Sequence, residues 1–255
     1  MTIASYSKFI QYKNLIQSLP SIKEETILSD QFLLEKDEKK QLEIYYAPFE
    51  YVNERAKVVI VGITPGLNQM EQSFSTVLNA KNQAVNDEDI LSQVKNNSSF
   101  EGSMRKNLVQ MLDEIGLHKY LNISSTIEIF NKASYLVHTT SVITYPVFHR
   151  GNNYSGSTPN MLKTELLKKY VTDQFVTELN QMDKPLIIPL GAKVSKVFDY
   201  LVEKQILDSS LILNGFPHPS GANGSRKKTF DANKEQMKDM LRVHFQVESL
   251  AAFNG

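Results

Sequence analysis

The sequence predicts an α/β fold of three layers, in which helices cover a central, mostly parallel four-stranded sheet, with a helical extension at the N-terminus. Short apolar runs, several of them rich in β-branched residues, are typical of strands buried on both faces. Segments with helical spacing stand between these runs, and such alternation implies right-handed crossovers and parallel strands. A chain of 255 residues that is 41% hydrophobic is long enough for one large domain with an extension.

The chain is expected to form two regions. Residues 1–50 form a polar, mostly helical extension packed on the core, in which Phe9, Leu15 and Leu19 share one helical face. Residues 51–255 form the α/β domain. Its first strand, 57–61, ends at Gly62, and the polar residues 67–100 combine helix with a long loop.

The remaining elements follow from the same periodicities. A helix over 103–115 stops at Gly116, a residue type that favours helix C-termini. Glycines and prolines over 144–160 indicate a loop. The other expected elements are a second strand over 133–142, a helix over 162–175, a third strand over 185–190, a helix over 192–201, a fourth strand over 211–213 and a last helix over 231–247.

Composition limits the partners and cofactors. The 28 basic and 28 acidic residues give a formal net charge of zero, so we expect any contact with a polyanion such as DNA to depend on a local group of basic residues. The absence of cysteine excludes disulfides and thiolate-bound metals or iron–sulfur clusters, and the five histidines are scattered. The first residues lack a charged segment followed by an apolar one, and no apolar run is long enough to cross a bilayer. We expect a cytoplasmic monomer with no cofactor, no metal and no membrane partner.

Two tight turns follow predicted strands, where open α/β sheets bind their ligands. In the first, Gly62-Ile63-Thr64-Pro65-Gly66, the glycines let backbone approach a ligand and the proline makes the turn rigid. The second, His218-Pro219-Ser220-Gly221-Ala222-Asn223-Gly224, sets a titratable donor beside small residues whose N–H groups suit an anion.

As an ordered pair, these turns resemble the two active-site motifs of the uracil-DNA glycosylase superfamily. The resemblance covers about residues 45–245 and extends to Tyr45-Tyr46-Ala47-Pro48, the helix ending in Glu114-Ile115-Gly116-Leu117 and the segment Pro189–Lys193. It implies DNA as partner and an enzyme that flips a nucleotide into a pocket and hydrolyses the bond from sugar to base.

The resemblance also implies a role for each candidate residue. His218 would donate a hydrogen bond to the departing base, and Thr64 stands where relatives hold the attacking water. Ser220 and the Gly221 amide would bind a DNA phosphate, and Ala222 and Asn223 would fill the gap that the flipped nucleotide leaves in the base stack. Arg226 and Lys227 would supply positive charge next to the DNA. The residues expected to form the base pocket are Gly62, Ile63, Pro65, Gly66, Phe74, His138 and Thr139.

Departures from the family pattern indicate an unusual substrate. A threonine hydroxyl is no base near neutral pH, so Thr64 can only position water. Gly66 replaces an aromatic residue that blocks substituents on the ring, and Thr139 or Thr140 replaces an asparagine that reads uracil. The expected substrate is a modified pyrimidine, such as hypermodified cytosine of foreign DNA, read by residues 67–100 and the loop 149–158.

Three other interpretations remain open at this point: a conventional uracil or mismatch glycosylase, a DNA-binding or damage-sensing protein without activity, and a nucleotide-binding α/β protein in which both motifs are coincidental. Each residue also has an ordinary structural interpretation, since phenylalanines are commonly buried, lone histidines are often structural, and Lys/Arg side chains are commonly solvated.

Overall fold

The computed structural model describes residues 7–100 and 102–253, which form two compact units assembled from interleaved segments. The first unit contains the described residues up to Val52, together with Ile63–Ser99 and Thr140–Gln181. The second contains Asn53–Gly62, Phe100–Thr139 and the described residues from Met182 onward.

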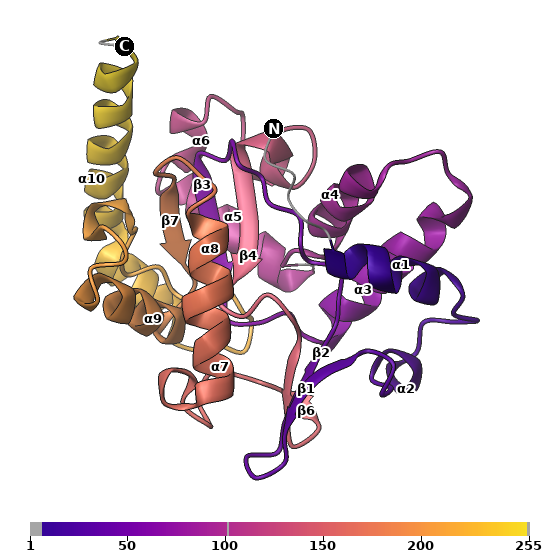
Figure 1. Ribbon diagram of the computed structural model, residues 1–255. Helices are drawn as coiled ribbons and strands as arrows, with labels where there is room; N and C mark the ends of the chain where they lie inside the picture. Colours follow the sequence, from indigo (N-terminus) through magenta and orange to yellow (C-terminus); the bar gives the residue numbers. More distant parts are fainter. Residues whose placement is uncertain (1–6, 101, 254–255) are drawn as a thin grey trace. The chain divides into compact units, whose positions relative to one another are not determined.

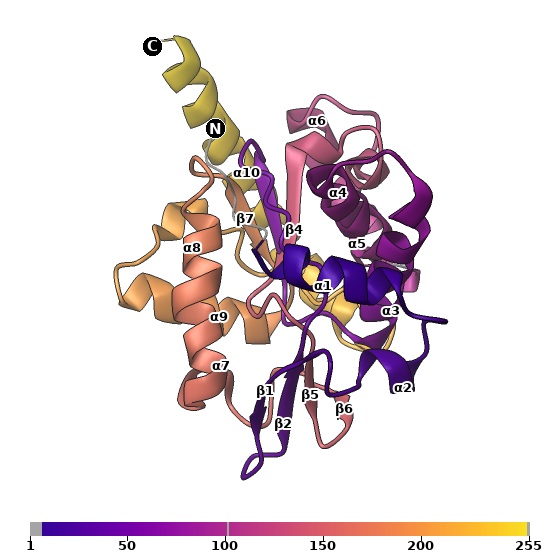
Figure 2. The same ribbon diagram turned by 45° about the vertical axis from the view of Figure 1, so that its right-hand side comes forward.

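The second unit is built around a sheet with the strand order β4-β3-β7 (Figures 1 and 2). The strands are β3 (Val58–Gly62), β4 (Val137–Ser141), whose last residues belong to the first unit, and β7 (Leu186–Pro189). β3 and β7 are parallel, with Val59 opposite Ile187. Every residue of β3 and β7 is buried, which confirms the prediction of strands covered on both faces.

Helices supply the rest of the core of this unit. They are α5 (Ser103–Glu114), α6 (Leu117–Tyr120), α9 (Ala192–Glu203) and α10 (Arg226–Phe253), with 3-10 turns at Thr126–Phe130, Ser134–Leu136 and Ser209–Leu211. Leu108 and Leu112 of α5 and Met237 and Leu241 of α10 belong to one hydrophobic cluster with Ile60. α5 ends as predicted, because Gly116 takes a left-handed conformation with φ 84°.

The prediction of a fourth full strand is not confirmed. The sheet has three strands among the described residues, and the segment expected at 211–213 adds one isolated parallel bridge, between Ile212 and Ile187. The Leu213 N–H also donates to the Ile187 carbonyl oxygen at 2.8 Å. A 3-10 turn over Ser209–Leu211 leaves too little extended chain for a longer ladder.

The first unit contains a second, antiparallel sheet and two groups of helices (Figure 2). The helices are α1 (Ser7–Gln17), α2 (Glu24–Ile27), α3 (Leu67–Asn79), α4 (Asp87–Ser98), α7 (Glu165–Lys169) and α8 (Val176–Leu179), with a π-helical stretch at Tyr170–Phe175 and 3-10 turns at Ala80–Asn82 and Met161–Lys163. The strands, in the order β1-β2-β5-β6, are β1 (Leu33–Asp37), β2 (Leu42–Tyr45), β5 (Val147–His149) and β6 (Asn152–Asn153).

Three local predictions are corrected in this unit. Residues 33–45 of the extension form the β1–β2 hairpin rather than helix, because Leu42 and Ile44 alternate toward the core with period two. Residues 144–160 contain the β5–β6 hairpin as well as loop. Residues 67–100 are mostly two helices. Asn86 caps the N-terminus of α4, and its side chain accepts a hydrogen bond from the Asp89 N–H.

None of the helices in the described ranges is both long and apolar enough to span a membrane.

Candidate functional site

The first turn continues directly from β3 and is tied to the chain after β4. The Ile143 N–H donates to the Ile63 carbonyl oxygen at 3.1 Å. The Thr64 hydroxyl donates to the Tyr145 carbonyl oxygen at 2.7 Å and accepts from the Val147 N–H at 3.1 Å. Its hydrogen is therefore committed, and what Thr64 offers a ligand is one oxygen lone pair.

Pro65 and Gly66 lead from this turn into α3. The Gly66 N–H donates to the side-chain oxygen of Gln69 at 3.1 Å, which satisfies one of the donors at the start of the helix. Gly66 has φ −90°, a value open to any residue, so its backbone does not require glycine. What glycine provides here is space, and an added Cβ would lie 3.6 Å from both Asn153 Nδ2 and Oδ1.

The loop 149–158, expected to read the substrate, contacts this turn at a second point. Gly156 has φ 77°, and a Cβ added there would lie 3.1 Å from two side-chain carbons of Ile63. Glycine at this position allows both the positive φ and the close approach to Ile63. The hairpin and the segment that follows it are thus fitted to residues 63–66.

The structure gives the surroundings of three residues that are expected in the base pocket. Phe74 is fully buried and packs edge-on against Phe32 with ring centroids 4.8 Å apart, because it lies on the buried face of α3 one turn after Met70. His138 is buried, and its Nδ1 accepts from the Asn53 N–H at 3.4 Å. Thr139 is partly exposed, whereas the Thr140 hydroxyl is buried with no hydrogen-bond partner among the described residues.

The second turn, in the other unit, holds His218 in one tautomer. Its Nδ1 accepts from the Ser220 N–H at 3.3 Å, so the ring hydrogen is assigned to Nε2. Burial, and then the charge of Lys193, lower the pKa of His218, which favours the neutral ring. Gly191 permits this placement, because a Cβ there would lie 2.9 Å from the His218 Cβ.

Hydrogen bonds hold the tip of the second turn in shape. The Asn223 side chain donates to the His218 carbonyl oxygen at 3.0 Å, and the Ala222 N–H donates to the Ser220 hydroxyl oxygen at 3.2 Å. Arg226 donates to the Ser220 carbonyl oxygen at 2.7 Å and begins α10. Gly221 and Ala222 are exposed. The residues expected to bind DNA therefore form one ordered loop that ends at a helix N-terminus.

A charged cluster that sequence patterns did not reveal lies inside the first unit. Glu50 accepts hydrogen bonds from the hydroxyls of Tyr145 at 3.2 Å and Tyr46 at 3.3 Å. Burial raises the pKa of Glu50 to about 7, although these bonds and the charge of Lys8 act in the opposite direction. Burial also lowers the pKa of Lys95, which the charges of Glu178 and Glu50 oppose. These charges lie far apart in the chain, so no local spacing indicates the cluster.

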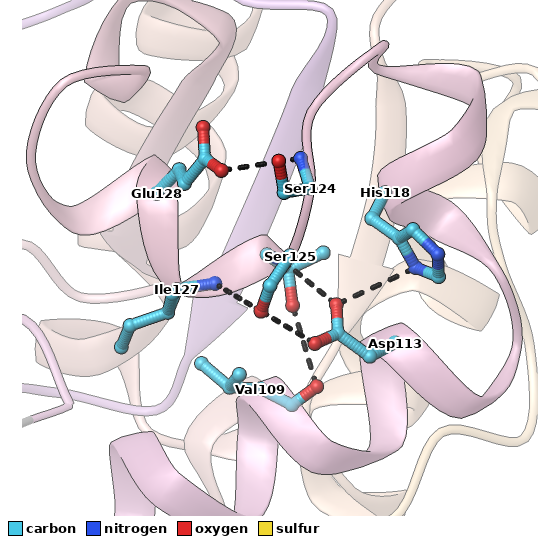
Figure 3. Close-up of polar contacts among 8 residues, drawn as sticks. Val109, Asp113, His118, Ser124, Ser125, Ile127 and Glu128 are labelled. Carbon is cyan, nitrogen blue, oxygen red and sulfur yellow. Dashed lines mark hydrogen bonds and ion pairs between the residues drawn. The ribbon is translucent and has the colours of Figure 1, made fainter.

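A grouping of Ser, His and Asp in the second unit is not a nucleophilic triad (Figure 3). The Ser125 hydroxyl donates to Asp113 at 2.6 Å rather than to a histidine. His118 Nδ1 lies 3.6 Å from Asp113, on the other side of the carboxylate from Ser125. The Ser125 and His118 side chains share no hydrogen bond, so Asp113 does not complete a nucleophilic triad. Its carboxylate instead joins α5 to the turn at Thr126 by accepting from the Thr126 N–H.

The described residues contain no group of three or more His, Cys, Asp and Glu side chains placed to hold a metal ion. The first turn presents a hydroxyl oxygen, that of Thr64, and the second presents an ordered imidazole donor and a basic loop.

The sequence model of the Uracil DNA glycosylase superfamily matches residues 49–242, and the chain belongs to this superfamily. It is also similar to the uncharacterized protein YoxB of Bacillus subtilis (strain 168), with 39% identity over 246 residues, which cover 93% of this chain and 95% of YoxB. No solved structure matches the chain significantly. The resemblance inferred from the two turns is thus confirmed at the level of the superfamily.

Proposed function

We propose that this protein is a DNA glycosylase that hydrolyses the bond between the sugar and a flipped-out, modified pyrimidine and leaves an abasic site. Membership of the Uracil DNA glycosylase superfamily supports the class of reaction. The observation that carries the assignment to these residues is the tautomer of His218, whose Nε2 hydrogen is left for a ligand because Nδ1 is engaged by the Ser220 N–H.

The departing base is stabilised by His218. As the bond from C1′ to the ring nitrogen breaks, its electron pair leaves with the base and negative charge develops on a ring carbonyl oxygen. The neutral ring of His218 donates its Nε2 hydrogen to that oxygen. Removing one such donor from an enzyme typically lowers the rate by about 10²–10³-fold.

The attacking water is positioned by Thr64 without a base. The hydroxyl hydrogen points to the Tyr145 carbonyl oxygen, so the remaining lone pair accepts a hydrogen from water and aims the water oxygen at C1′. The water oxygen bonds to C1′, and its proton leaves to solvent or to the departing base. A cationic sugar is a strong electrophile, so orientation contributes where general-base assistance is absent.

DNA is held by the loop that precedes α10. The Ser220 hydroxyl and the Gly221 amide bind a phosphate. Ala222 and Asn223 enter the gap that the flipped nucleotide leaves in the stack of bases. Arg226, Lys227 and Lys228 stand at the N-terminus of α10, where cations are unfavourable by about 0.3–1 kcal/mol each unless an anion is bound. A phosphate would offset that repulsion.

The preference for a modified base follows from Gly66. This position carries no side chain against the ring, so a substituent on the pyrimidine is not blocked by residue 66 itself. Hypermodified cytosine of foreign DNA is the substrate that we favour on this basis.

The test is incubation of the protein with double-stranded oligonucleotides that carry uracil, 5-methylcytosine, 5-hydroxymethylcytosine, glucosylated 5-hydroxymethylcytosine or no modification, followed by detection of abasic sites. His218→Ala should lower the rate by about 10²–10³-fold. His118→Ala, a histidine of the Asp113 grouping, is the matched control and should cleave as the unsubstituted protein does.

The outcomes separate the alternatives. Cleavage of modified cytosines alone supports the proposal, and cleavage of uracil alone identifies a conventional repair enzyme. Binding of DNA without cleavage of any base favours a damage-sensing protein, for which the lack of a base at Thr64 is the supporting observation. No binding and no cleavage would refute a role on DNA.

A further inference from the structure

The space left open by Gly66 is bordered by a polar side chain, that of Asn153. An added Cβ at residue 66 would lie 3.6 Å from Nδ2 and Oδ1 of Asn153 and 3.7 Å from the carbon between them. These nearly equal distances mean that the carboxamide presents its broad face to Gly66. The Nδ2 hydrogens lie in the plane of the amide, so a hydrogen-bond acceptor meets them at the edge of the amide, beside the space at Gly66. Asn153 thus stands at the wall that the sequence predicted to be open.

The position of Asn153 is fixed by its hairpin. Arg150 and Gly151 connect β5 to β6 with φ 55° and 71°, and positive φ at both residues is typical of a tight two-residue turn. Asn153 pairs with Phe148 of β5, and the next residue, Tyr154, is buried and donates its N–H to the Val147 carbonyl oxygen at 2.9 Å. Asn153 is exposed, but strand pairing at Asn153 and the hydrogen bond of Tyr154 fix its backbone.

The orientation of the carboxamide follows from one hydrogen bond. The Leu67 N–H, at the start of α3, donates to Asn153 Oδ1 at 2.9 Å. A flipped amide would set an NH₂ group against this N–H, so the oxygen must face Leu67. Nδ2 then carries two hydrogens for which no described residue is an acceptor.

We propose that Asn153 is a specificity-determining residue of the reaction: its Nδ2 group donates to a hydrogen-bond acceptor on the ring substituent of the flipped pyrimidine. This inference rests on the proposed function. The substrate class is a pyrimidine whose substituent carries a hydroxyl or other oxygen acceptor, as opposed to a methyl group or hydrogen. A base without that acceptor would leave the amide hydrogens desolvated and unpaired, which disfavours its complex.

Asn153→Asp separates recognition from structure. Aspartate keeps an oxygen for the Leu67 N–H and adds a negative charge at a helix N-terminus, where such charge is favourable. It removes both donor hydrogens. Asn160→Asp is the matched control, because Asn160 is also an exposed asparagine and its side-chain oxygen accepts from the Lys163 N–H at 3.1 Å, a bond that aspartate keeps.

The measured quantity is the ratio of kcat/KM for 5-hydroxymethylcytosine to that for 5-methylcytosine, two bases that differ by one hydroxyl group. We expect the unsubstituted protein and Asn160→Asp to favour the hydroxylated base by about 10–100-fold, and Asn153→Ala to bring the ratio close to one. Asn153→Asp should lower the ratio less than Asn153→Ala, because its carboxylate can accept a hydrogen bond from the hydroxyl. An unchanged ratio in Asn153→Ala, or no preference in the unsubstituted protein, would overturn the proposal.

A binding measurement keeps the two proposals distinguishable. The same two bases are placed on 2′-fluorinated sugars, which resist cleavage because fluorine destabilises the cationic sugar, and dissociation constants are compared. If no base is cleaved, the glycosylase proposal fails, and the ratio of dissociation constants decides the role of Asn153 by itself. Equal binding of both bases would then exclude recognition by Asn153.

Discussion

The Thr64 hydroxyl and the Tyr145 carbonyl oxygen are joined by a hydrogen bond of 2.7 Å. The Val147 N–H donates to the same hydroxyl at 3.1 Å. The side chain that the sequence predicts to position water therefore also joins the first turn to the backbone of Tyr145 and Val147. The side chain that we propose to orient the water is thus itself held in place, which is what catalysis by positioning would require.

Thr64→Val should therefore impair both structure and activity. Valine has the same shape but leaves the Val147 N–H and the Tyr145 carbonyl oxygen without a partner, at a cost of about 1–3 kcal/mol of unfolding free energy. It also removes the lone pair that orients the water, and we expect kcat to fall by about 10²-fold. Urea unfolding and single-turnover kinetics measure the two effects.

Thr64→Ser is the control for both effects of Thr64→Val, because serine keeps the hydroxyl and both hydrogen bonds. Its kcat should stay within a few-fold of that of the unsubstituted protein. If Thr64→Val were equally active, the hydroxyl would have a structural role alone.

Lys227→Ala tests the basic loop. A lysine that neutralises one phosphate contributes about one unit to the slope of the logarithm of the binding constant against the logarithm of salt concentration. The variant should show a slope shallower by about one and weaker binding at every salt concentration. Fluorescence anisotropy over a salt series measures both.

Lys238→Ala is the comparison on the same helix, since Lys238 pairs with Glu235 at 2.9 Å further along α10. Its slope should match that of the unsubstituted protein. Equal slopes for all three proteins would remove Lys227 from the DNA interface.

The core of the second unit could be predicted because its signals are local. Val58–Gly62 is an unbroken apolar run, and Gly116 stops a helix by its own conformational freedom. The fourth strand is shorter than predicted, because the apolar residues 211–213 are typical of a strand but the sequence pattern does not reveal the 3-10 turn over Ser209–Leu211. The hairpins β1–β2 and β5–β6 were missed because their strands are short and polar on one side.

The two turns of the candidate site could be found in the sequence, but their surroundings could not. Thr64 and Gly66 follow β3, and they and His218 stand in compact motifs. Asn153 reaches Gly66 through a hairpin 87 positions further along the chain, a separation that no periodicity indicates. For Phe74 the sequence left both core packing and a place in the base pocket open, and the structure shows the side chain buried against Phe32.

Asp113→Ala should destabilise the second unit without changing catalysis. The carboxylate accepts hydrogen bonds from the Ser125 hydroxyl at 2.6 Å and the Thr126 N–H at 2.7 Å (Figure 3). Charge-assisted bonds of this kind contribute about 1.5–3 kcal/mol, so we expect a loss of about 2 kcal/mol in unfolding free energy. Chemical unfolding measures the loss.

The control is Asp239→Ala, which removes an exposed pair with Arg242 at 2.9 Å and should cost less than about 0.5 kcal/mol. Glycosylase rates should be the same in both variants under conditions where both are folded. A selective loss of kcat in Asp113→Ala would instead give the Ser, His and Asp grouping a part in the reaction.

Glu50→Gln should change how stability depends on pH. Burial raises the pKa of Glu50 from 4.5 to about 7, so the native state keeps this proton at a pH where the unfolded chain has released it. The unfolding free energy therefore falls as pH rises from about 4.5 to 7, by up to about 3 kcal/mol, and is independent of this group above that range. Glutamine does not titrate, so the variant lacks this contribution.

The measurement is urea unfolding at pH 5 and pH 8. The difference in unfolding free energy between Glu50→Gln and the unsubstituted protein should shift in favour of the variant by about 2–3 kcal/mol between the two conditions. Glu54→Gln, which alters an exposed carboxylate four residues away, should show no such shift. A constant difference for Glu50→Gln would mean that Lys8, Lys95 and the two tyrosines stabilise the Glu50 carboxylate enough to offset its burial.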